Sequence, residues 1–555
     1  MSFGFCDKVL HVNLSNREIR VEEPGERFFR TYFGGWGVIA HYLLKELEPG
    51  GDPLGPDNVL VFAAGVMTGV PVGGTGRSAV GAKSPLTGGF GEADVGGFWG
   101  AELKRAGWDA IVITGCAEKP VYLWIRDGEV EIRDGAHLWG EKTADVEKIL
   151  KQELEDNRIR VAQCGLAGEN LVRYACVIHD VRHGAGRTGL GAVMGAKNLK
   201  AIAVRGTGQV QVADGDRVSP LADWLRGQQE QWVSFQEHGT SGFLAYLDEL
   251  GMLPTRNFQE GSFEGAERIT GRRMTETILV GRETCFACPI TCKRIVKVTG
   301  GYEVDPVYGG PEYETVAALG SCCGIDDLEA IVYANQLCNA YGLDTISTGV
   351  IIAWAMECFE RGLLTVEDTG GLLLNFGNAE AMTRLVEQIA RRQAFGDLLA
   401  EGCQGAAQQI GRGTEKYAMQ IKGQEIPMHE PRAKFALNLG YVTSPTGADH
   451  MHNIHDRQYT SERGIQSVQP LGILGPLSTD DLGPAKVRLT KYHIDWRVSY
   501  NCLGMCMFMP YSKEQMRDVV QGVTGWNTSL FEMMWGITTA GTPARNVAAV
   551  VPKPP

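Results

Sequence analysis

The sequence has 555 residues, 53 of them basic and 66 acidic, which gives a formal net charge of −13 at pH 7. This length suits about three domains at ~100–200 residues each, and 44% hydrophobic with 21% charged residues excludes a mostly disordered chain. The acidic balance argues against nucleic acid or an anionic membrane surface as the main partner, while 72 glycines predict many loops that approach a ligand or take a positive φ.

The amino terminus has no basic stretch followed by an apolar one, so we expect a cytoplasmic protein without a secretory signal. The longest apolar stretch, residues 349–358, is far shorter than the ~20 residues of a membrane span. Because disulfides are rare in a reducing compartment, the fourteen cysteines are predicted to be free, and a subset is available as metal ligands. Nine others are interpreted as small buried apolar residues: Cys6, Cys116, Cys164, Cys176, Cys322, Cys323, Cys338, Cys358 and Cys403.

Residues 1–207 are predicted to form a β-rich domain. Alternating strands at 121–126 and 129–133 are joined by an Asp-Gly dipeptide, which is typical of a two-residue hairpin turn because glycine accepts a positive φ. Further strand patterns occur at 59–62 and 110–113, whereas helical patterns such as 143–154 are a minority.

The chain beyond residue 207 is predicted to be mainly helical, with domains at 208–415 and 416–555 and an unpacked tail at 538–555. One helix is expected to begin after Asp326-Asp327 and to end at the capping residue Gly342. Ser347-Thr348 is expected to cap the next helix. These patterns together predict an α+β fold.

A short pattern, Asn-x-x-Gly-apolar-(Asp or Cys), occurs twice, at residues 339–344 and 501–506, each time after a helical segment. The helix before the second copy is predicted to follow Pro484 and to bury Val487, Lys491, Ile494 and Val498. Two equivalent loops could hold two similar ligands or one pseudo-symmetric ligand. Alternatively, the match is a coincidence, since glycine caps are common on helices.

Cys285-Phe-Ala-Cys288-Pro-Ile-Thr-Cys292 is the strongest chemical signal in the chain. It brings three thiolates to one centre, and a cubane iron–sulfur cluster takes four, so the fourth is sought in the Cys502/Cys506 pair. Zinc is an alternative, although structural zinc sites usually combine one close pair of ligands with a distant pair. Radical enzymes of the adenosylmethionine type use the reverse spacing, and three core cysteines by coincidence is the remaining interpretation.

With these motifs the chain resembles the tungsten-containing aldehyde ferredoxin oxidoreductase family, from about Val12 to about Trp526. The resemblance includes Lys83-Ser-Pro-Leu-Thr-Gly88, Gly96-Gly-Phe-Trp-Gly-Ala-Glu-Leu-Lys104, Gly191-Ala-Val-Met-Gly195 and Gly310-Pro-Glu-Tyr-Glu314. It implies an amino-terminal β base under two helical domains, with tungsten, or less readily molybdenum, held between them by two pyranopterins. It also implies a [4Fe-4S] cluster and oxidation of aldehydes to carboxylic acids with ferredoxin as acceptor.

The resemblance assigns the two repeated loops to the two pterins, through Asn339, Gly342, Leu343, Asp344, Asn501, Gly504 and Met505. It makes Cys506, rather than Cys502, the fourth cluster ligand beside Cys285, Cys288 and Cys292. The two asparagines stand where the family has aspartate, so their hydrogen bonds to pterin nitrogens must differ in part. Arg77 matches an arginine near the dithiolene and phosphates, and Asp94 and the backbone of Gly184 match ligands of a phosphate-bridging Mg²⁺.

The resemblance implies Glu314 and His450 as the acid–base pair. A histidine proton can stabilise the negative charge that develops on a carbonyl oxygen, and a glutamate can take a proton from water. Glu312 competes with Glu314, which the family position favours. His450-Met-His452 is alternatively a zinc site, and His452 and His455 are interpreted as structural.

Two further segments are interpreted as having no special function. The glycine-rich loop 186–195 is not read as a dinucleotide fingerprint because no strand is predicted before it. Lys293-Arg294 is interpreted as a solvated pair rather than as a ferredoxin-docking site.

The expected partners are ferredoxin, or a ferredoxin-like subunit, and a small aldehyde, with no nucleic acid and no membrane; homo-oligomer formation is left open. One alternative is a same-fold enzyme of reductive chemistry, like the catalytic subunit of tungsten benzoyl-coenzyme A reductases. Another is an electron-transfer protein that keeps the cluster and has lost the pterin site. The two asparagines motivate it, as does a chain that stops about thirty residues after Trp526, where family members usually continue.

Overall fold

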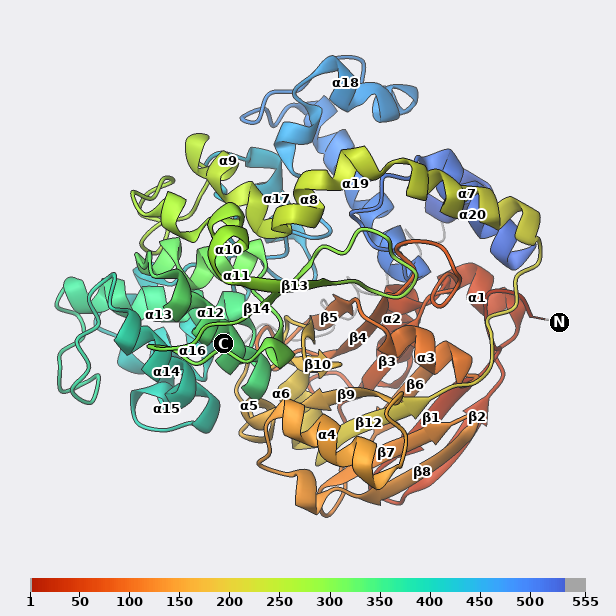
Figure 1. Cartoon of the computed structure of the whole chain (residues 1–555), viewed down its shortest axis with the longest axis horizontal. Coiled ribbons are helices and arrows are strands. Elements are labelled where there is room, and N and C mark those ends of the chain that lie inside the picture. Colours follow the sequence, from red (N-terminus) through yellow and green to blue (C-terminus); the bar gives the residue numbers. More distant parts are fainter. Residues whose placement is uncertain (1, 535–555) are drawn as a thin grey trace.

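The computed structural model describes residues 2–534, with two β-sheets in the amino-terminal part and helices in most of the rest (Figure 1). This arrangement confirms the predicted α+β class. No helix in the described part of the chain is both long and apolar enough to cross a membrane. The predicted tail at 538–555 lies outside the described residues.

Two six-stranded sheets make up the amino-terminal region, and they share one topology. The first has the order β2-β1-β6-β3-β4-β5 and the second β8-β7-β12-β9-β10-β11. In each, one pair is parallel, β1 with β6 and β7 with β12, and every other pair is antiparallel. Each strand therefore has a counterpart six strands later, so the region consists of two equivalent halves.

The strands of the first sheet are β1 (Val9–Asn13), β2 (Glu18–Glu22), β3 (Leu60–Ala64), β4 (Ser78–Lys83), β5 (Phe90–Val95) and β6 (Ala110–Thr114). Those of the second are β7 (Val121–Arg126), β8 (Glu129–Asp134), β9 (Arg160–Cys164), β10 (Val177–His179), β11 (His183–Ala185) and β12 (Leu199–Arg205). The predicted hairpin is confirmed as β7 and β8, and the two other predicted strands are β3 and β6.

The two sheets pack on a shared apolar core. Phe62 and Ile111 of the first sheet lie in one buried cluster with Leu123 and Ile202 of the second. Trp99 is also in this cluster and donates its indole N–H to the Ile202 carbonyl. Helices of this region are α1 (Glu26–Tyr32), α2 (Gly35–Glu46), α3 (Trp99–Arg105), α4 (Thr143–Glu153), α5 (Leu166–Glu169) and α6 (Leu190–Ala196).

Figure 1 shows two helical groups beyond the sheets, one around α11 to α16 and one around α7, α19 and α20. The elements from residue 215 to 399 are α7 (Gly215–Gly227), α8 (Val233–His238), α9 (Leu244–Glu249), α10 (Gly271–Thr277), β13 (Leu279–Glu283), β14 (Lys293–Val296), α11 (Tyr313–Leu319), α12 (Leu328–Tyr341), α13 (Thr345–Glu360), α14 (Ala379–Arg391) and α15 (Phe395–Leu399). Those that follow are α16 (Gly402–Ile410), β15 (Gln420–Ile421), β16 (Gln424–Glu425), α17 (Phe435–Thr443), α18 (Glu462–Ile465), α19 (Pro484–Leu503) and α20 (Lys513–Thr524). The domain boundary near residue 415 stays a prediction.

Helix caps were predicted with mixed success. Asp327 caps α12, and Gly342 ends it with φ 75°, as expected. The prediction that Ser347-Thr348 caps α13 is wrong, because Asp344 accepts the Ile346 N–H and the helix starts at Thr345. The Ser347 hydroxyl bonds to the Asp344 carboxylate from inside the first turn.

The predicted buried face of α19 is confirmed in its second half, where Val498 is buried and Ile494 packs against the core, and is wrong in its first half. Val487 is 46% exposed, and Lys491 lies on the surface. The helix instead buries Leu489 and Lys486, whose ammonium pairs with the buried Asp456 carboxylate at 2.8 Å. Lys486 can be buried because Asp456 neutralises its charge, and no apolar pattern in the helix indicates this.

The two repeated loops dock on equivalent points of the two sheets. Gly65 follows β3, and a Cβ there would lie 2.1 Å from the Leu503 carbonyl carbon. Gly165 follows β9, and a Cβ there would lie 2.2 Å from the Tyr341 carbonyl oxygen. Leu503 and Tyr341 occupy the same position in the two loops, so the loops repeat along with the sheets and their match is not a coincidence.

Replacing Gly65 by Ala is expected to displace the second loop, because main-chain atoms have no free rotamer with which to avoid the new methyl group. We expect a lower Tm, corresponding to about 1–3 kcal/mol of overpacking. Calorimetry with Gly301→Ala as the control tests this, since nothing lies within 4 Å of a Cβ at Gly301. Equal Tm values for the two variants would contradict the close docking.

Candidate active site

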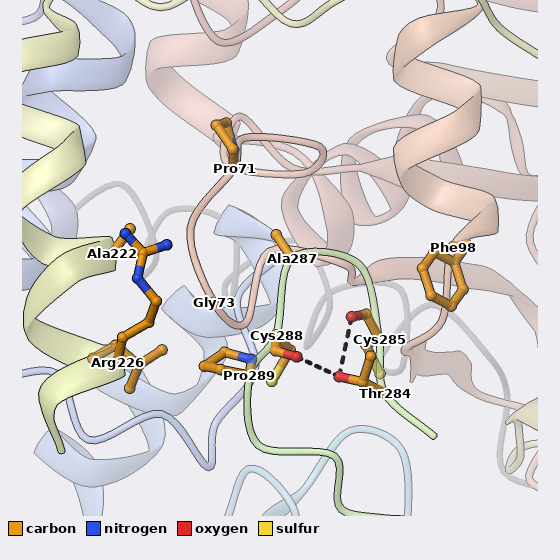
Figure 2. A pocket seen from close by; sticks show the side chains of 11 residues that line it. Pro71, Gly73, Phe98, Ala222, Arg226, Thr284, Cys285, Ala287, Cys288 and Pro289 are labelled. Carbon is orange, nitrogen blue, oxygen red and sulfur yellow. Dashed lines mark hydrogen bonds between the residues drawn. The ribbon is translucent and has the colours of Figure 1, made fainter. Parts of the chain in front are cut away.

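The three closely spaced cysteines lie on the connection between the antiparallel strands β13 and β14, and Figure 2 shows two of them, Cys285 and Cys288. Positive φ angles of 54° at Ala287 and 51° at Thr291 curl this connection. The Thr284 hydroxyl donates to the Cys288 carbonyl at 2.5 Å, which holds the curl closed. Each of the three thiols is half-buried.

Cys506, and not Cys502, lies beside these cysteines. Burial raises the pKa of Cys285 and raises that of Cys288 to about 11, and the charge of Cys506 contributes to both shifts. The Cys506 N–H donates to the Gly74 carbonyl at 2.8 Å. Cys502 is fully buried, and the groups that shift its pKa include none of the three cysteines.

The cysteine sulfurs do not form a compact ligand set for one metal ion. Within residues 2–534, one set of three potential ligand atoms lies within 4.8 Å of one another, namely those of Glu314, His429 and His450. Four thiolates around one zinc would be about 3.8 Å apart, given a Zn–S distance of ~2.3 Å. No three cysteine sulfurs of the described residues meet this spacing.

Arg77 connects the cysteines to a polar site on the first sheet. Its Nη2 lies 3.5 Å from the Cys506 sulfur and its Nη1 2.5 Å from Asp94 Oδ2. Burial alone would lower the pKa of Arg77, but the charges of Cys506, Asp94 and Cys285 raise it. Arg77 Nε and Asp94 Oδ1 are buried without a hydrogen-bond partner in the described chain. Unpaired buried polar atoms on an arginine and an aspartate suit a ligand that carries phosphate and a cation.

The glycine-rich loop at 186–195 does follow a strand, β11, so the expectation that no strand precedes it is wrong. Gly184 pairs antiparallel with Ile178 at this edge of the sheet, and β11 lies near β5, which carries Asp94. Because β11 is antiparallel to its neighbour, it does not start the parallel βαβ unit that binds a dinucleotide.

Arg187, in this glycine-rich loop, was missed by the sequence analysis. Its Nε lies 3.3 Å from Asp344 Oδ2, and its two other nitrogens donate to the Ala448 and Glu425 carbonyls at 2.7 and 2.6 Å. The last residue of each repeated loop therefore contacts an arginine, Asp344 with Arg187 and Cys506 with Arg77.

The two loop asparagines are not equivalent. Asn339 donates to the Tyr308 carbonyl at 2.9 Å, and thus holds a neighbouring turn. Asn501 is buried, its Nδ2 lies 2.8 Å from His452 Nε2, and it donates to Glu92 at 3.3 Å. Burial would lower the pKa of His452, but Asp449 raises it to about 9. His452, interpreted from the sequence as structural, therefore contacts the second loop directly.

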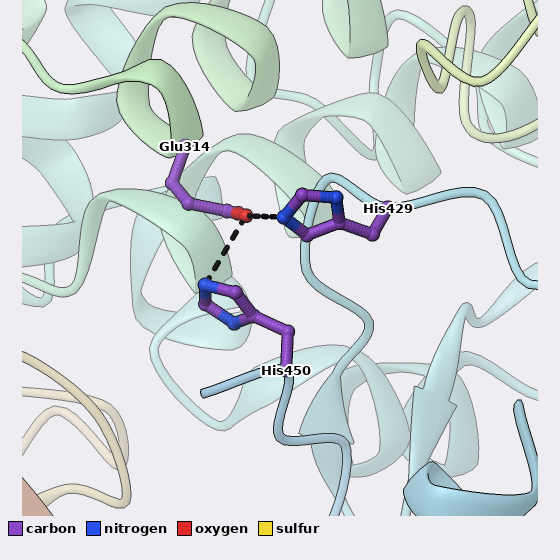
Figure 3. Close-up of side chains that lie close together, drawn as sticks. All are labelled: Glu314, His429 and His450. Atoms are coloured by element: carbon purple, nitrogen blue, oxygen red, sulfur yellow. Dashed lines mark ion pairs between the residues drawn. The ribbon is translucent and has the colours of Figure 1, made fainter. Parts of the chain in front are cut away.

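Glu314 faces His450, as Figure 3 shows. Glu314 Oε1 lies 3.4 Å from His450 Nε2 and 3.1 Å from His429 Nε2. Its other oxygen accepts the Met428 N–H at 2.8 Å. Glu312 instead bonds to Lys293 at 2.6 Å and to Thr240, so it faces the cysteine connection and is the less suitable partner of His450.

The prediction that Lys293-Arg294 is a solvated pair is wrong. Arg294 is buried and donates to the Thr291 carbonyl at 2.9 Å, and Lys293 pairs with Glu312. Both side chains brace the cysteine connection because its carbonyls and the nearby carboxylate need donors.

Two family models match almost the whole chain. One, described as aldehyde ferredoxin oxidoreductase, N-terminal domain, matches residues 9–206, and the other, described as domains 2 and 3, matches residues 220–536. The chain belongs to the aldehyde ferredoxin oxidoreductase family.

Individual relatives of this family member agree. A tungsten-containing aldehyde ferredoxin oxidoreductase of Thermococcus kodakarensis is 39% identical over 537 residues, which cover 95% of this chain and 86% of the relative. A second one, of Pyrococcus abyssi, is 40% identical over 536 residues with the same coverage. The resemblance inferred from the motifs is thereby confirmed, and the chain is an oxidoreductase.

A solved structure extends the comparison to the fold. The active site complex BamBC of benzoyl coenzyme A reductase, in complex with 1,5-dienoyl-CoA, matches with a TM-score of 0.85 at 26% identity. The match covers 99% of this chain and 90% of that chain. This family member thus shares its architecture with an enzyme of different chemistry, so its reaction has to be argued from its own side chains.

Proposed function

We propose that this family member is a tungsten–pterin enzyme that oxidises aldehydes to carboxylic acids and passes the electrons through a [4Fe-4S] cluster to ferredoxin. The observation that carries the proposal is the position of Cys506. It ends the second repeated loop, touches Arg77, and lies beside Cys285, Cys288 and Cys292. One loop would thus hold both a pterin and a cluster ligand, so electrons have a short path between the two groups.

The residues available between the loops fit the cofactor. Asn339, Gly342, Leu343 and Asp344 would hold one pterin, and Asn501, Gly504 and Met505 the other. The unpaired atoms of Arg77 and Asp94, with the backbone of Gly184, would bind the phosphates and a bridging Mg²⁺. When bound, the tungsten centre accepts the two electrons of the oxidation; molybdenum is the less favoured metal.

Glu314 and His450 supply the acid–base groups in this proposal. His450 Nδ1 is buried without a hydrogen-bond partner in the described residues, so it is free to bind a substrate oxygen. A proton held there would stabilise the charge that develops on the carbonyl oxygen, while Glu314 takes a proton from the attacking water. The 3.4 Å between Glu314 and His450 lets both groups serve one substrate.

Electrons would leave through the cysteine connection. A cavity of about 250 Å³ adjoins it, lined by Pro71, Phe98, Arg226, Cys285 and Cys288 among others (Figure 2). The chain is acidic overall, so a ferredoxin needs local basic groups such as Arg226. A cytoplasmic location fits such a partner, and homo-oligomer formation stays an untested prediction.

Metal analysis and a substrate comparison test the proposal. We expect about one tungsten and about four iron atoms per chain, and reduction of a viologen dye by a panel of aldehydes. Iron without tungsten would leave only an electron-transfer role. The structural similarity to BamBC makes reductive chemistry the second candidate, and reduction of an acyl thioester without aldehyde oxidation would favour it.

A further inference from the structure

His429, the third side chain labelled in Figure 3, lies beside Glu314 and extends the Glu314–His450 pair into a chain of contacts. His429 Nε2 is 3.1 Å from Glu314 Oε1, and His429 Nδ1 is 3.0 Å from Lys434 Nζ. Lys434 is 3% exposed and lies just before α17. No carboxylate of the described residues forms an ion pair with Lys434. Its recorded side-chain contact is the one with His429.

The Lys434 contact determines the tautomer of His429. A charged ammonium carries three donors and no acceptor, so His429 Nδ1 must accept from it. The proton of the neutral imidazole then sits on Nε2, which lies 3.1 Å from Glu314 Oε1. The other carboxylate oxygen accepts the Met428 N–H, so each oxygen of Glu314 has an N–H group close to it.

The same logic argues against a metal at this cluster. Two histidines and one glutamate are a familiar ligand set for zinc or iron. A metal on His429 Nε2 would require the proton on Nδ1 and an acceptor facing it. Lys434 Nζ faces that nitrogen instead, so His429 is arranged as a hydrogen-bond donor.

The segment that carries His429 is fixed in place. The Tyr313 hydroxyl donates to the Met428 carbonyl at 2.6 Å and the Tyr441 hydroxyl to the His429 carbonyl at 3.3 Å. The His455 ring packs edge-on against His429, with centroids 4.6 Å apart. These contacts leave the imidazole little freedom to turn away from Glu314.

We propose that His429 and Lys434 are positioning residues, which hold the Glu314 carboxyl group in place beside His450. This role rests on the proposed function. It requires a charged Lys434, because a neutral amine can also accept a hydrogen bond from a protonated Nδ1. The tautomer of His429 is then no longer fixed.

The charge of Lys434 is sensitive to pH. Burial lowers its pKa to about 8, partly opposed by the negative charges around it. The ionisable groups that face it are Glu314 on α11, His429 and Glu430 on the preceding segment, His455, and Asp456 and Arg457 beyond α17. Since the charged form is the one that fixes His429, we expect kcat to fall as the pH rises through about 8.

Three variants of the metal-loaded enzyme test the positioning role. Lys434→Met should lower kcat about tenfold or more with little change in KM, and should abolish the fall near pH 8. Lys434→Arg should restore most of kcat and move the fall to higher pH, because arginine stays charged. Lys197→Met is the matched control: Lys197 is equally buried, with a pKa lowered by burial to about 8, but it bonds only to the Pro56 and Gly115 carbonyls.

A spectroscopic readout separates this role from a merely structural one. Nitrogen-15 NMR of histidine-labelled enzyme should show His429 as a single Nε2–H tautomer in the wild type and as a mixture in Lys434→Met. An unchanged His429 signal, or a wild-type pH profile in Lys434→Met, overturns the positioning role. A wild-type enzyme that loads both metals and oxidises no aldehyde overturns the proposed function instead. The NMR comparison still tests whether Lys434 fixes the tautomer of His429.

Discussion

The Glu314→Gln enzyme is expected to keep its tungsten and iron and to lose at least about 100-fold in kcat for aldehyde oxidation. The amide oxygen can still accept the Met428 N–H, so the fold around it should persist. It cannot take up a proton, however, and water attack then lacks its base. Metal content and dye-linked turnover measured on the same preparation test this.

Glu312→Gln is the matched control for this prediction. Glu312 lies two residues away but bonds to Lys293 and Thr240 beside the cysteines. Its replacement should alter the reduction potential of the cluster and change turnover per iron-loaded enzyme only a few-fold. Wild-type turnover in Glu314→Gln would move the acid–base role to another residue.

Removal of Cys506 is the second change with a large expected effect. A cubane cluster left with three thiolates loses iron or changes its type, so Cys506→Ala should contain fewer than about four iron atoms and should show weakened visible absorption. Electron transfer to the dye should fall together with the iron content.

Cys502→Ala provides the comparison, since it removes a thiol from the same helix end. Cys502 is fully buried, and its pKa shift has no contribution from the cysteines of residues 285–292. Its replacement should leave iron content and colour intact. The opposite result for the pair would mean that the second loop is shifted in register.

Sequence reasoning succeeded where the signal is local. The Asp-Gly turn between β7 and β8 and the caps Asp327 and Gly342 depend on a few neighbouring residues. It failed for the first half of α19, where Lys486 is buried because Asp456, thirty residues earlier, neutralises it. No pattern within the helix could reveal this distant partner.

The candidate site likewise contains residues that the sequence indicates and residues that only the fold reveals. The three cysteines of residues 285–292 stand out by spacing, but the choice of Cys506 over Cys502 came from the family resemblance and not from the residues alone. His429, Lys434 and Arg187 carry no motif, and only the folded chain brings them beside Glu314 and Asp344. A weak signal for Arg187 was its place in the glycine-rich loop 186–195, which was set aside when the dinucleotide interpretation was rejected.

The paired halves of the amino-terminal region imply a division of labour. Gly65 and Gly165 seat two loops of one design, yet one loop closes with a carboxylate that caps α13 and the other with a thiol beside three more. The two equivalent halves of this scaffold have therefore become functionally different. In the proposed enzyme, electrons from the metal would leave only on the side of Cys506. An acceptor bound on the opposite side would receive none.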